Sequence, residues 1–321
     1  MVAPLGALRS AAVVRVEFLM ANAQLISDLE VRATVAAKLL PVAVIIPTRN
    51  EAENLPRCLA SVAGCREVYV IDSGSTDRTA EIARSFGARV IQFHYAGGWP
   101  KKRQWALDTL QITSPWVLLL DADEVLTPEL AEEMDEAMRR PGFNGYWVPL
   151  RINFLGRTLR HGDTSFRKLS LFRRGMGRFE CRLQNQDAAM ADMEVHEHVI
   201  VDGPTGELKN ALAHHNVHSL DRYIAKHNEY SNWEARVLSR QGSSPANALK
   251  PAWFGTQAQR RRWLKQKFLR LPGSPVLLFF YKYVFRLGLL DGIPGLIYCG
   301  FQAVQLFHVK AKMYELRSHS E

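Results

Sequence analysis

From residue 41 onward, short runs of apolar, β-branched residues alternate with stretches in which apolar residues recur at helical spacing. The apolar runs predict five strands, at residues 42–46, 68–71, 89–93, 116–120 and 146–150. The helical stretches are residues 52–62, 77–86, 101–110 and a further helix capped by Thr127. This alternation predicts an α/β fold in which a mostly parallel sheet carries helices on both faces.

The alternation also indicates where a ligand is expected to bind. In open α/β sheets, ligands bind outside the carboxyl ends of the strands. The segments in that position are 47–51, 72–77 and 121–124, which follow the first, second and fourth predicted strands. These three segments are therefore the first candidates for a functional site.

The chain beyond the fifth predicted strand is less regular. Residues 151–215 lose the alternation and carry short strand-like pieces, whereas residues 220–239 predict a long helix. Residues 241–257, with their Gly, Ser and Pro, predict a linker. The expected domains are a catalytic domain at 41–218, divided into a nucleotide half at 41–150 and an acceptor half at 151–218, and a C-terminal helical region at 219–321.

Residues 1–40 form an N-terminal extension to which the sequence assigns no role. Its uncharged run between Arg9 and Arg15 is too short for the core of a signal peptide. The extension is interpreted either as an amphipathic surface helix or as an over-long start, with translation beginning at Met20.

Residues 259–307 combine positive charge with apolar and aromatic side chains. A strongly basic stretch at 259–270 precedes two apolar stretches, 275–285 and 287–307. Neither supplies the roughly 20 uninterrupted apolar residues that a membrane span needs. The pattern favours a basic amphipathic segment that lies on an anionic bilayer. The alternative is an ordinary helical pair that packs on the core and exposes a solvated basic face.

Composition narrows the class of protein. With 47% hydrophobic and 23% charged residues, the chain is globular rather than disordered or fibrous. The 41 Lys and Arg residues exceed the 32 Asp and Glu residues, and the net charge of +9 favours an anionic partner. The four cysteines show neither metal nor redox spacing, so we expect reduced, packed thiols in a cytoplasmic protein.

Asp121 and Asp123 directly follow the most hydrophobic predicted strand. Residues i and i+2 of an extended chain point to the same side, so the two carboxylates are expected side by side at the edge of the sheet. Carboxylate oxygens suit Mg²⁺ or Mn²⁺, and such an ion can bridge a diphosphate. The alternative is a helix-capping turn before Thr127.

Other polar segments have weaker signals. The GxGxxG and GxxxxGK[ST] motifs are absent, which argues against a classical NAD enzyme and a P-loop NTPase. Lys101–Arg103 opens a predicted helix, where cations can hold a diphosphate or simply form a solvated face. Within residues 72–77, the needs of a tight turn explain Gly74 and Asp77 well but explain Asp72 less well.

Titratable residues are densest between Glu194 and His198. The HExxH spacing of zinc proteases is not met there. Glu197 could act as a general base beside a hydroxyl group, and an exposed strand with alternating His and Glu explains the pattern equally well. A second cluster, which supplies either a metal ligand or a helix cap, is His214, His215 and His218.

Taken together, these segments resemble the family-2 glycosyltransferases, which have a GT-A fold. The matching segments are Ile45–Glu51, Val70–Thr79 and Leu119–Glu124, in this order and at this spacing. They cover roughly residues 41–150. Looser similarity to the branch that includes lipopolysaccharide inner-core β-glucosyltransferases is found at Val195–Glu197, Tyr223–Tyr230 and Gly288–Leu296.

The resemblance implies a donor site made of Pro47, Thr48, Asn50, Glu51, Asp72, Gly74, Lys102, Arg103, Asp121, Ala122 and Asp123. Within it, Thr48, Glu51 and Asp72 are expected to contact uridine. Lys102 and Arg103 are expected near the diphosphate. The first carboxylate of the acidic pair is expected to hold ribose or metal, and the second to be the main ligand of Mg²⁺ or Mn²⁺.

On the acceptor side, the resemblance implies that Glu197 is the catalytic base, with His196 or His198 orienting it. His215 is expected as a supporting residue. The QxxRW motif of processive polysaccharide synthases is interpreted as absent, because the letters Q-R-R-R-W at 259–263 fall in what we interpret as a basic linker. Transfer of a single sugar is therefore expected.

The implied activity is an inverting, metal-dependent transfer of a sugar, with glucose expected, from a UDP-sugar to a hydroxyl group. The expected acceptor is a lipid-linked saccharide or lipopolysaccharide core, in cell-envelope or exopolysaccharide biosynthesis. The expected location is the inner face of the cytoplasmic membrane, reached through the basic C-terminal region, and no nucleic acid is expected as a partner.

Two other classes of protein stay open. One is a sugar-nucleotide nucleotidyltransferase, although residues 47–51 lack the Gly- and Lys-rich loop that follows the first strand in such enzymes. The other is a non-catalytic protein that binds membranes or nucleic acid, although no nucleic-acid-binding signature is present.

Overall fold

The computed structural model describes residues 39–164, 166–185, 192, 194, 197–215, 220–239, 251–254 and 257–318. The chain divides into two units, residues 1–40 and 41–321, and the structure below is that of the second unit. Most of the N-terminal extension and of the expected linker lie outside the described residues. The expected division of the second unit at residue 218 stays a prediction.

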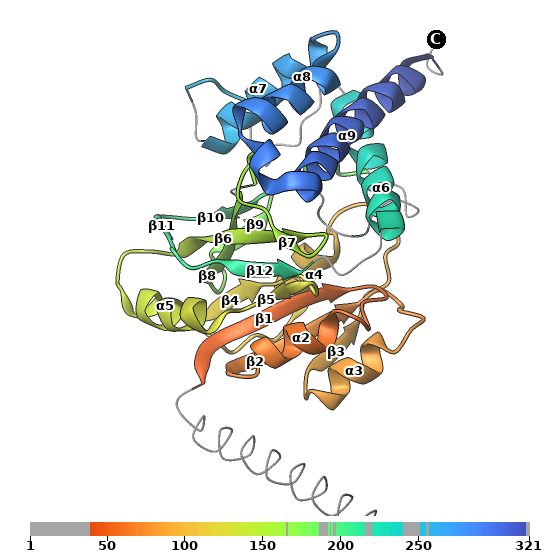
Figure 1. The fold of residues 1–321 in the computed structure, drawn as a ribbon. Coiled ribbons are helices and arrows are strands. Elements are labelled where there is room, and N and C mark those ends of the chain that lie inside the picture. The colour runs from red at the N-terminus through yellow and green to blue at the C-terminus, as the bar shows by residue number, and fades with distance from the viewer. Residues whose placement is uncertain are drawn as a thin grey trace, which may run out of the picture. The chain divides into compact units, whose positions relative to one another are not determined.

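The nucleotide half shows the predicted alternation of strands and helices (Figure 1). Its elements are β1 (Leu40–Thr48), α2 (Leu55–Ser61), β2 (Cys65–Asp72), α3 (Thr79–Ser85), β3 (Arg89–Gln92), α4 (Lys102–Thr109), β4 (Trp116–Leu119) and α5 (Pro128–Arg139). Thr127 caps α5 as predicted, because its Oγ1 accepts a hydrogen bond from the backbone N–H of Leu130 at 3.3 Å. Helix α2 begins three residues later than predicted, with Pro56 in its first turn.

The central strands of this half, β1 and β4, are buried on both faces. Val42 to Ile46 of β1 have no exposed surface, and the whole of β4 is buried. One face of β1, with Ala43 and Ile45, packs with Ile71 of β2 and Ala106 of α4 in a single cluster. Coverage on both faces explains why these strands are continuous apolar runs in the sequence. The four cysteines are buried free thiols, as expected.

The acceptor half extends the same sheet, which we did not predict. The strand order is β3-β2-β1-β4-β8-β6-β12-β5. Strand β8 (Phe166–Arg173) lies between β4 and β6 (Gly145–Phe154) and is antiparallel to both, whereas β12 (Leu212–His215) is parallel to β6. The strand predicted at 146–150 is therefore confirmed as part of β6, but it is not the neighbour of β4. Shorter strands are β5 (Glu124–Val125), β7 (Arg157–Thr158), β9 (Gly177–Phe179), β10 (Val199–Val201) and β11 (Thr205–Glu207).

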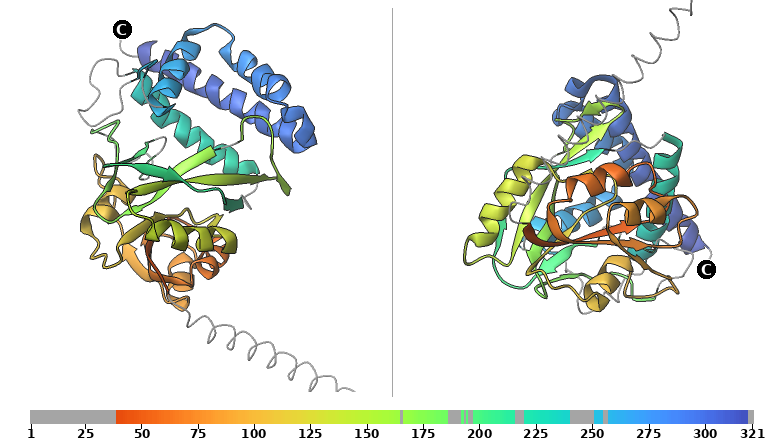
Figure 2. Two further views of the ribbon diagram at one scale, coloured as in Figure 1. Left: turned by 90° about the vertical axis from the view of Figure 1, so that its left-hand side faces the viewer. Right: turned by 90° about the horizontal axis from the view of Figure 1, so that it is seen from below.

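The C-terminal region is helical, as predicted. It contains α6 (Leu220–Ser239), α7 (Gln257–Arg270), α8 (Ser274–Phe280), the π-helical turn η1 (Tyr281–Phe285), the 3₁₀ turn η2 (Gly288–Asp291) and α9 (Gly292–Ser318). Helix α9 packs against α6 and α8, and Figure 2 shows these helices gathered on one side of the sheet. In the described part of the chain, no helix combines the length and the apolar composition that crossing a bilayer demands.

Several contacts join this region to the acceptor half, and two of them involve buried carboxylates. Asp291, which is buried, accepts hydrogen bonds from the backbone N–H groups of Arg160 (3.1 Å) and His161 (2.8 Å). Arg262 donates two hydrogen bonds to the fully buried carboxylate of Glu180, at 2.9 and 2.5 Å. The interpretation of residues 259–263 as a linker was therefore wrong: they belong to helix α7, and the side chain of Arg262 is fixed by an ion pair.

Candidate active site

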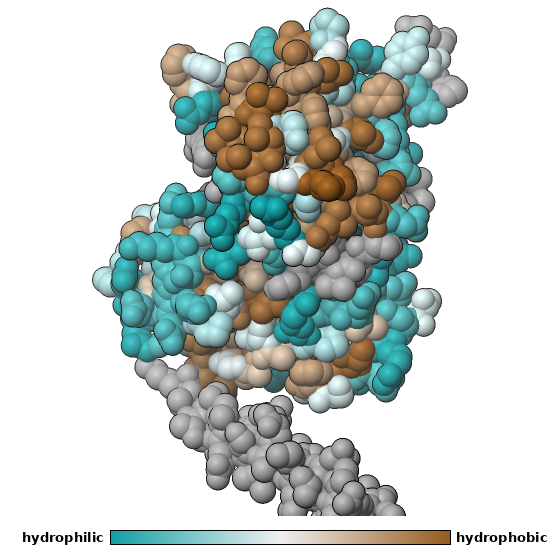
Figure 3. All heavy atoms as spheres, in the orientation of Figure 1, coloured by the Kyte–Doolittle hydropathy of each residue, from teal (hydrophilic) through white to brown (hydrophobic). Residues whose placement is uncertain are grey.

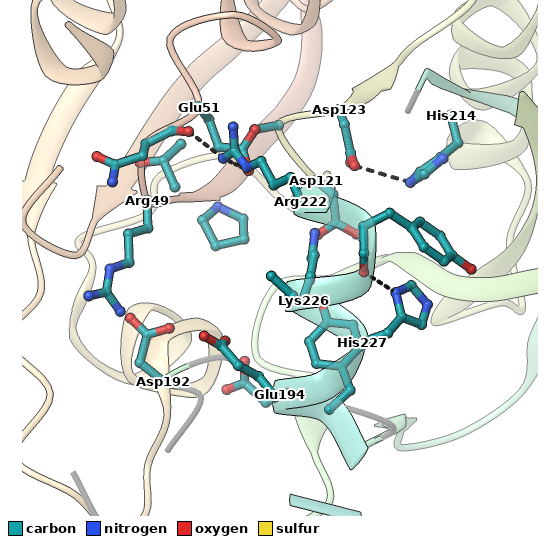
Figure 4. A pocket seen from close by; sticks show the side chains of 18 of the residues that line it. Arg49, Glu51, Asp121, Asp123, Asp192, Glu194, His214, Arg222, Lys226 and His227 are labelled. Carbon is teal, nitrogen blue, oxygen red and sulfur yellow. Dashed lines mark hydrogen bonds and ion pairs between the residues drawn. The ribbon is translucent and has the colours of Figure 1, made fainter. Parts of the chain in front are cut away.

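A pocket of about 920 Å³ opens at the carboxyl ends of β1 and β4. Its walls come from the β1–α2 loop, the start of α4, the segment after β4, and helices α6 and α9 (Figure 4). Nine of the expected donor-side residues line it: Pro47, Thr48, Asn50, Glu51, Lys102, Arg103, Asp121, Ala122 and Asp123. The pocket thus lies at the edge of the sheet that the strand pattern indicated.

The first wall is a loop that a second loop holds in place. Asn50 has a positive φ of 55°, its backbone N–H donates to Ser75 Oγ at 2.9 Å, and its Oδ1 accepts from the backbone N–H of Thr76 at 2.8 Å. The backbone N–H of Glu51 donates to Thr79 Oγ1 at 2.8 Å. These bonds fix the β1–α2 loop to the β2–α3 loop, so the segments 47–51 and 72–77 act as one surface.

Asp72 and Gly74 lie outside the lining of the pocket as described. Asp72 is 1% exposed, and its carboxylate accepts hydrogen bonds from Thr48 Oγ1 (3.2 Å), Gln92 Nε2 (3.1 Å) and the backbone N–H of Ser75 (3.1 Å). Gly74 has φ 65° and makes the turn that brings the backbone N–H of Ser75 back to Asp72. In this arrangement, Asp72 positions Thr48 from behind rather than presenting its carboxylate to the pocket.

The acidic pair after β4 is surrounded by cations. The carboxylate of Asp121 pairs with Arg103 and, at 3.0 Å, with Lys168 of β8. Lys168 also binds the buried carboxylate of Glu124 at 2.6 Å. Burial works against ionisation, but Arg103 and Lys168 still hold the pKa of Asp121 well below its usual range. The ionised form of Asp121 is therefore favoured. We missed Lys168 because nothing in the sequence indicated that β8 lies beside β4.

Asp123 faces His214 at the end of β12, with 3.2 Å between its Oδ2 and the Nε2 of the imidazole. Burial opposes ionisation, yet His214 and Lys226 hold the pKa of Asp123 well below its usual range. Against the effect of its own burial, His214 has its pKa raised by Asp123. The second histidine cluster thus reaches the acidic pair through His214, and the side chain of His215, the residue we expected, lies outside the described side chains.

These residues fit a divalent cation. Asp121 and Asp123 supply hard oxygen ligands, and the Nδ1 of His214 is buried with no hydrogen-bond partner among the described residues. Within that described part, no group of three or more His, Cys, Asp or Glu residues forms a complete metal site. Oxygen atoms of a ligand or of water would complete the coordination, as they commonly do for Mg²⁺.

The start of α4 brings a buried cation to the pocket. Lys102 donates to the backbone carbonyl of Thr48 at 3.0 Å and pairs with Asp192 at 3.1 Å. Burial lowers the pKa of Lys102, and Asp192 opposes that effect. The carboxylate of Glu194 accepts hydrogen bonds from two backbone N–H groups in the first turn of α4, at 3.2 and 2.9 Å, and so caps this helix. Asp192 and Glu194 line the pocket opposite the acidic pair (Figure 4).

Helix α6 forms the remaining wall with side chains that we had not assigned to the site. Arg222 hydrogen-bonds to the carbonyl of Asn50 and lies 3.5 Å from the carboxylate of Glu51. Lys226 lies one turn further, and its pKa is raised by Tyr230 and, despite burial, by the acidic pair. The spacing of 222, 226 and 230 places them along one stripe of the helix. This stripe and the similarity noted at Tyr223–Tyr230 are the sequence signals that could have identified them.

Glu197 lies behind the pocket rather than in its described lining. Its Oε2 pairs with Lys101 Nζ at 2.8 Å, and both side chains are fully buried. Its Oε1 accepts from the backbone N–H of Arg182 at 3.3 Å. Burial raises the pKa of Glu197 to about 7, with Lys101 opposing the shift. The ammonium group of Lys101 also lies 4.6 Å from the centre of the Trp233 ring.

The structure describes only one of the two histidines that we expected to flank Glu197. His198 is exposed, and its backbone bridges to Glu180 through N–H and C=O bonds of 3.1 and 2.9 Å. Through Glu180, this segment is connected to Arg262 of α7. His196 lies outside the described residues.

Fold and site together define an α/β protein of the GT-A type, with a polar pocket that suits a phosphorylated ligand. Comparison with known proteins agrees with this class. Residues 43–199 match the family model described as glycosyl transferase family 2. The lipopolysaccharide core biosynthesis glycosyltransferase LpsC of Rhizobium meliloti (strain 1021) is 30% identical over 295 residues, which is 86% of this chain and 93% of that protein. An uncharacterized glycosyltransferase of Rickettsia bellii (strain RML369-C) is 29% identical over 64% of this chain and 70% of its own.

Solved structures are more distant. TarS of S. aureus (residues 1–349) is 15% identical, with a TM-score of 0.40 over 87% of this chain and 92% of that one. Glucosyl-3-phosphoglycerate synthase of Mycobacterium tuberculosis, solved with Mn²⁺, uridine diphosphate and phosphoglyceric acid, is 18% identical, with a TM-score of 0.39 over 67% of this chain and 82% of that one.

The match to LpsC over most of both chains is decisive, and this chain belongs to glycosyl transferase family 2. The predicted family is thus confirmed, together with its relation to a lipopolysaccharide core glycosyltransferase. Of the three classes that the sequence left open, the glycosyltransferase is the one that the comparisons support.

Proposed function

We propose that this protein is an inverting, metal-dependent glycosyltransferase that moves one glucose from UDP-glucose to a hydroxyl of a lipid-linked saccharide or lipopolysaccharide core. The observation that carries the proposal is the pocket itself. It brings two carboxylates with lowered pKa values at the end of β4 together with Lys102, Arg103 and Lys226, in a chain of family 2. Carboxylates for a metal and cations for phosphates are what a sugar-nucleotide diphosphate requires.

In this proposal, the β1–α2 loop receives the nucleoside. Thr48 and Glu51 line the pocket and offer a hydroxyl and a carboxylate to uridine, with Pro47 and Asn50 beside them. Asp72 and Gly74 contribute by holding Thr48 and the paired loops in position. Because the loop is fixed by hydrogen bonds before any ligand binds, little ordering free energy is lost on binding.

The diphosphate is proposed to lie between the acidic pair and the cations of α4 and α6. Asp123, oriented by His214, and Asp121 would hold Mg²⁺ or Mn²⁺. When bound, the ion supplies charge stabilisation for the departing UDP. Lys102 and Arg103 approach the phosphates from the start of α4, and Lys226 approaches from α6. Ala122 holds the acidic pair at the correct spacing along the chain.

The acceptor hydroxyl needs a base, because inversion proceeds by a single displacement. We keep Glu197 as the proposed base, supported by its pKa of about 7, which is close to the optimum for proton transfer at neutral pH. Reaching the acceptor requires its carboxylate to leave Lys101. Asp192, whose side chain already lines the pocket, is the competing candidate. His196, His198 and His215 are proposed to orient the base or the acceptor.

The acceptor class rests on the relation to LpsC, whose name assigns it to lipopolysaccharide core biosynthesis. A saccharide carried on a lipid is built at a membrane, so we propose that this enzyme works at the inner face of the cytoplasmic membrane. The basic C-terminal region is proposed to hold it there by its charge. Nucleic acid is not a proposed partner.

Thermal unfolding with UDP, GDP, CDP and dTDP, each with Mn²⁺ and with EDTA, tests the donor site. A ligand at 100 times its Kd should stabilise the folded chain by about 2.7 kcal/mol. We expect stabilisation by UDP only, and only with the metal. A metal-dependent response to another nucleotide would change the donor, and no response to any nucleotide would refute the proposal.

A further inference from the structure

The C-terminal helices leave a large apolar surface uncovered. Six bulky side chains there are each at least 49% exposed, and we call them the apolar ridge: Leu277, Phe280, Phe285, Leu290, Ile293 and Phe307. Figure 3 shows apolar residues gathered in one broad patch over the helices of this region, whereas the lower part of the same face is mainly hydrophilic. Soluble monomers rarely expose contiguous apolar patches of this kind without a function for them.

In helix α9, the exposed apolar residues lie on a face of their own, opposite the face that packs on the rest of the protein. Its inner face carries Tyr298 and Gln302, which line the pocket, and Val309, which is buried. Ile293 and Phe307 lie on the opposite face, about half a turn from Tyr298, and are 73% and 60% exposed. A surface helix normally turns a polar face outward, and a helix that is apolar on both faces needs a second apolar neighbour.

The charge of this region indicates what kind of neighbour covers the apolar ridge. Residues 257–318 contain 11 Lys and Arg residues but only two Asp and Glu residues, a surplus equal to the net charge of the whole chain, +9. Arg286 stands inside the ridge region itself, where it is half-exposed and pairs with Asp163 at 3.4 Å. Arg262 and Lys265 pair with acidic residues outside this segment, so part of the surplus is neutralised locally. A second copy of this chain would bring the same positive charge to the contact, whereas an anionic lipid surface would attract it.

We infer that the apolar ridge inserts into the headgroup and upper acyl region of an anionic bilayer, with the surrounding cations on the phosphates. This goes beyond attraction by the basic segment, because burial of the ridge supplies binding that salt does not screen. The pocket lies on the other face of α9, about one helix diameter, roughly 10 Å, from the bilayer. An acceptor anchored in the same leaflet then reaches the pocket around this helix.

Vesicle flotation tests the inference without donor or acceptor. The full chain is mixed with vesicles of phosphatidylethanolamine and phosphatidylglycerol, in low and high salt, and compared with the double variant Phe285→Ser/Ile293→Ser. We expect the wild type to float in both salts, and the variant to lose about tenfold or more of its binding. The matched control is Phe86→Ser, which removes a 48% exposed phenylalanine from the nucleotide half and should float like the wild type.

Two further measurements identify what covers the ridge. A photoactivatable phospholipid in the vesicles should label peptides from residues 274–307. Sedimentation velocity without vesicles should give the same mass for wild type and ridge variant. Three results would each overturn the inference. The ridge variant could float as well as the wild type, the lipid could label only other segments, or the ridge variant could change self-association alone. A chain that binds vesicles through the ridge but shows no nucleotide-dependent stabilisation would instead refute the proposed function alone.

Discussion

Asp121 and Glu197 are both carboxylates paired with cations, but they differ in access to water. The Asp121 side chain is 30% exposed and pairs with Arg103 and Lys168, whereas Glu197 and Lys101 are fully buried. At Asp121 the two cations outweigh burial and the pKa falls, and at Glu197 burial outweighs a single cation and the pKa rises to about 7. The number of cationic partners and the exposure to water therefore set the pKa of each carboxylate. Asp121 favours its ionised form, which can hold a metal ion, whereas Glu197 can exchange a proton near neutral pH.

The largest expected effect is that of Glu197→Gln. If Glu197 is the base, transfer should fall by about 10²- to 10⁴-fold. In the wild type, activity should rise with pH through about 7, because only the deprotonated carboxylate accepts a proton, and this limb should vanish in the variant. Initial rates across pH, at a temperature where both proteins are folded, measure this. If the limb survives in Glu197→Gln and disappears in Asp192→Asn, the base is Asp192.

Breaking the buried ion pair between Arg262 and Glu180 should lower the free energy of unfolding. Arg262→Met leaves the carboxylate of Glu180 buried without this partner, and losing one partner of a buried ion pair costs about 3–5 kcal/mol. Urea unfolding measures the change. The matched control is Arg178→Met, whose exposed pair with Asp202 is worth about 0–1 kcal/mol. Equal losses in the two variants would show that Glu180 does not depend on Arg262.

The acidic pair should respond mainly in function. Asp123→Asn removes the main proposed metal ligand, and transfer should fall by about 10²- to 10³-fold. The stabilisation by UDP with Mn²⁺ should fall with it. Thermal unfolding without ligand measures any loss of stability separately, because the carboxylate is buried and pairs with His214. Unchanged UDP binding in the presence of metal would remove Asp123 from the site.

A smaller effect is expected at His214. This imidazole orients Asp123, and losing such a partner weakens metal binding by about 10- to 100-fold. Because Asp123 raises the pKa of His214, protonation at lower pH should oppose the metal, so wild-type affinity for Mn²⁺ should fall as the pH decreases. Calorimetric titration of His214→Ala with Mn²⁺ and UDP measures this. A pH dependence that is unchanged in the variant would place its origin elsewhere.

The nucleotide half was predictable because its signals are local. Each strand is a run of apolar residues, each helix has an apolar face, and the acidic pair directly follows β4. The acceptor half was not predictable in the same way. Strand β8 pairs with β4 across more than 40 residues of chain, and no local pattern specifies an antiparallel strand in that place. The base is the hardest to assign, because residues 192–197 contain three carboxylates whose orientation depends on the elements packed around them.

The sequence by itself determined the α/β class, the edge of the sheet at which the pocket opens, and the basic, apolar character of the C-terminus. Periodicity and composition carry this information because they reflect local burial. Only the tertiary structure decided which side chains meet. Lys168 reaches Asp121 across 47 residues, and Arg222 reaches Asn50 across 172. It also decided that Glu197 is buried against Lys101 while Asp192 faces the pocket. Such pairings arise from packing between elements distant in the chain, and it is packing that sets exposure and charge at each group.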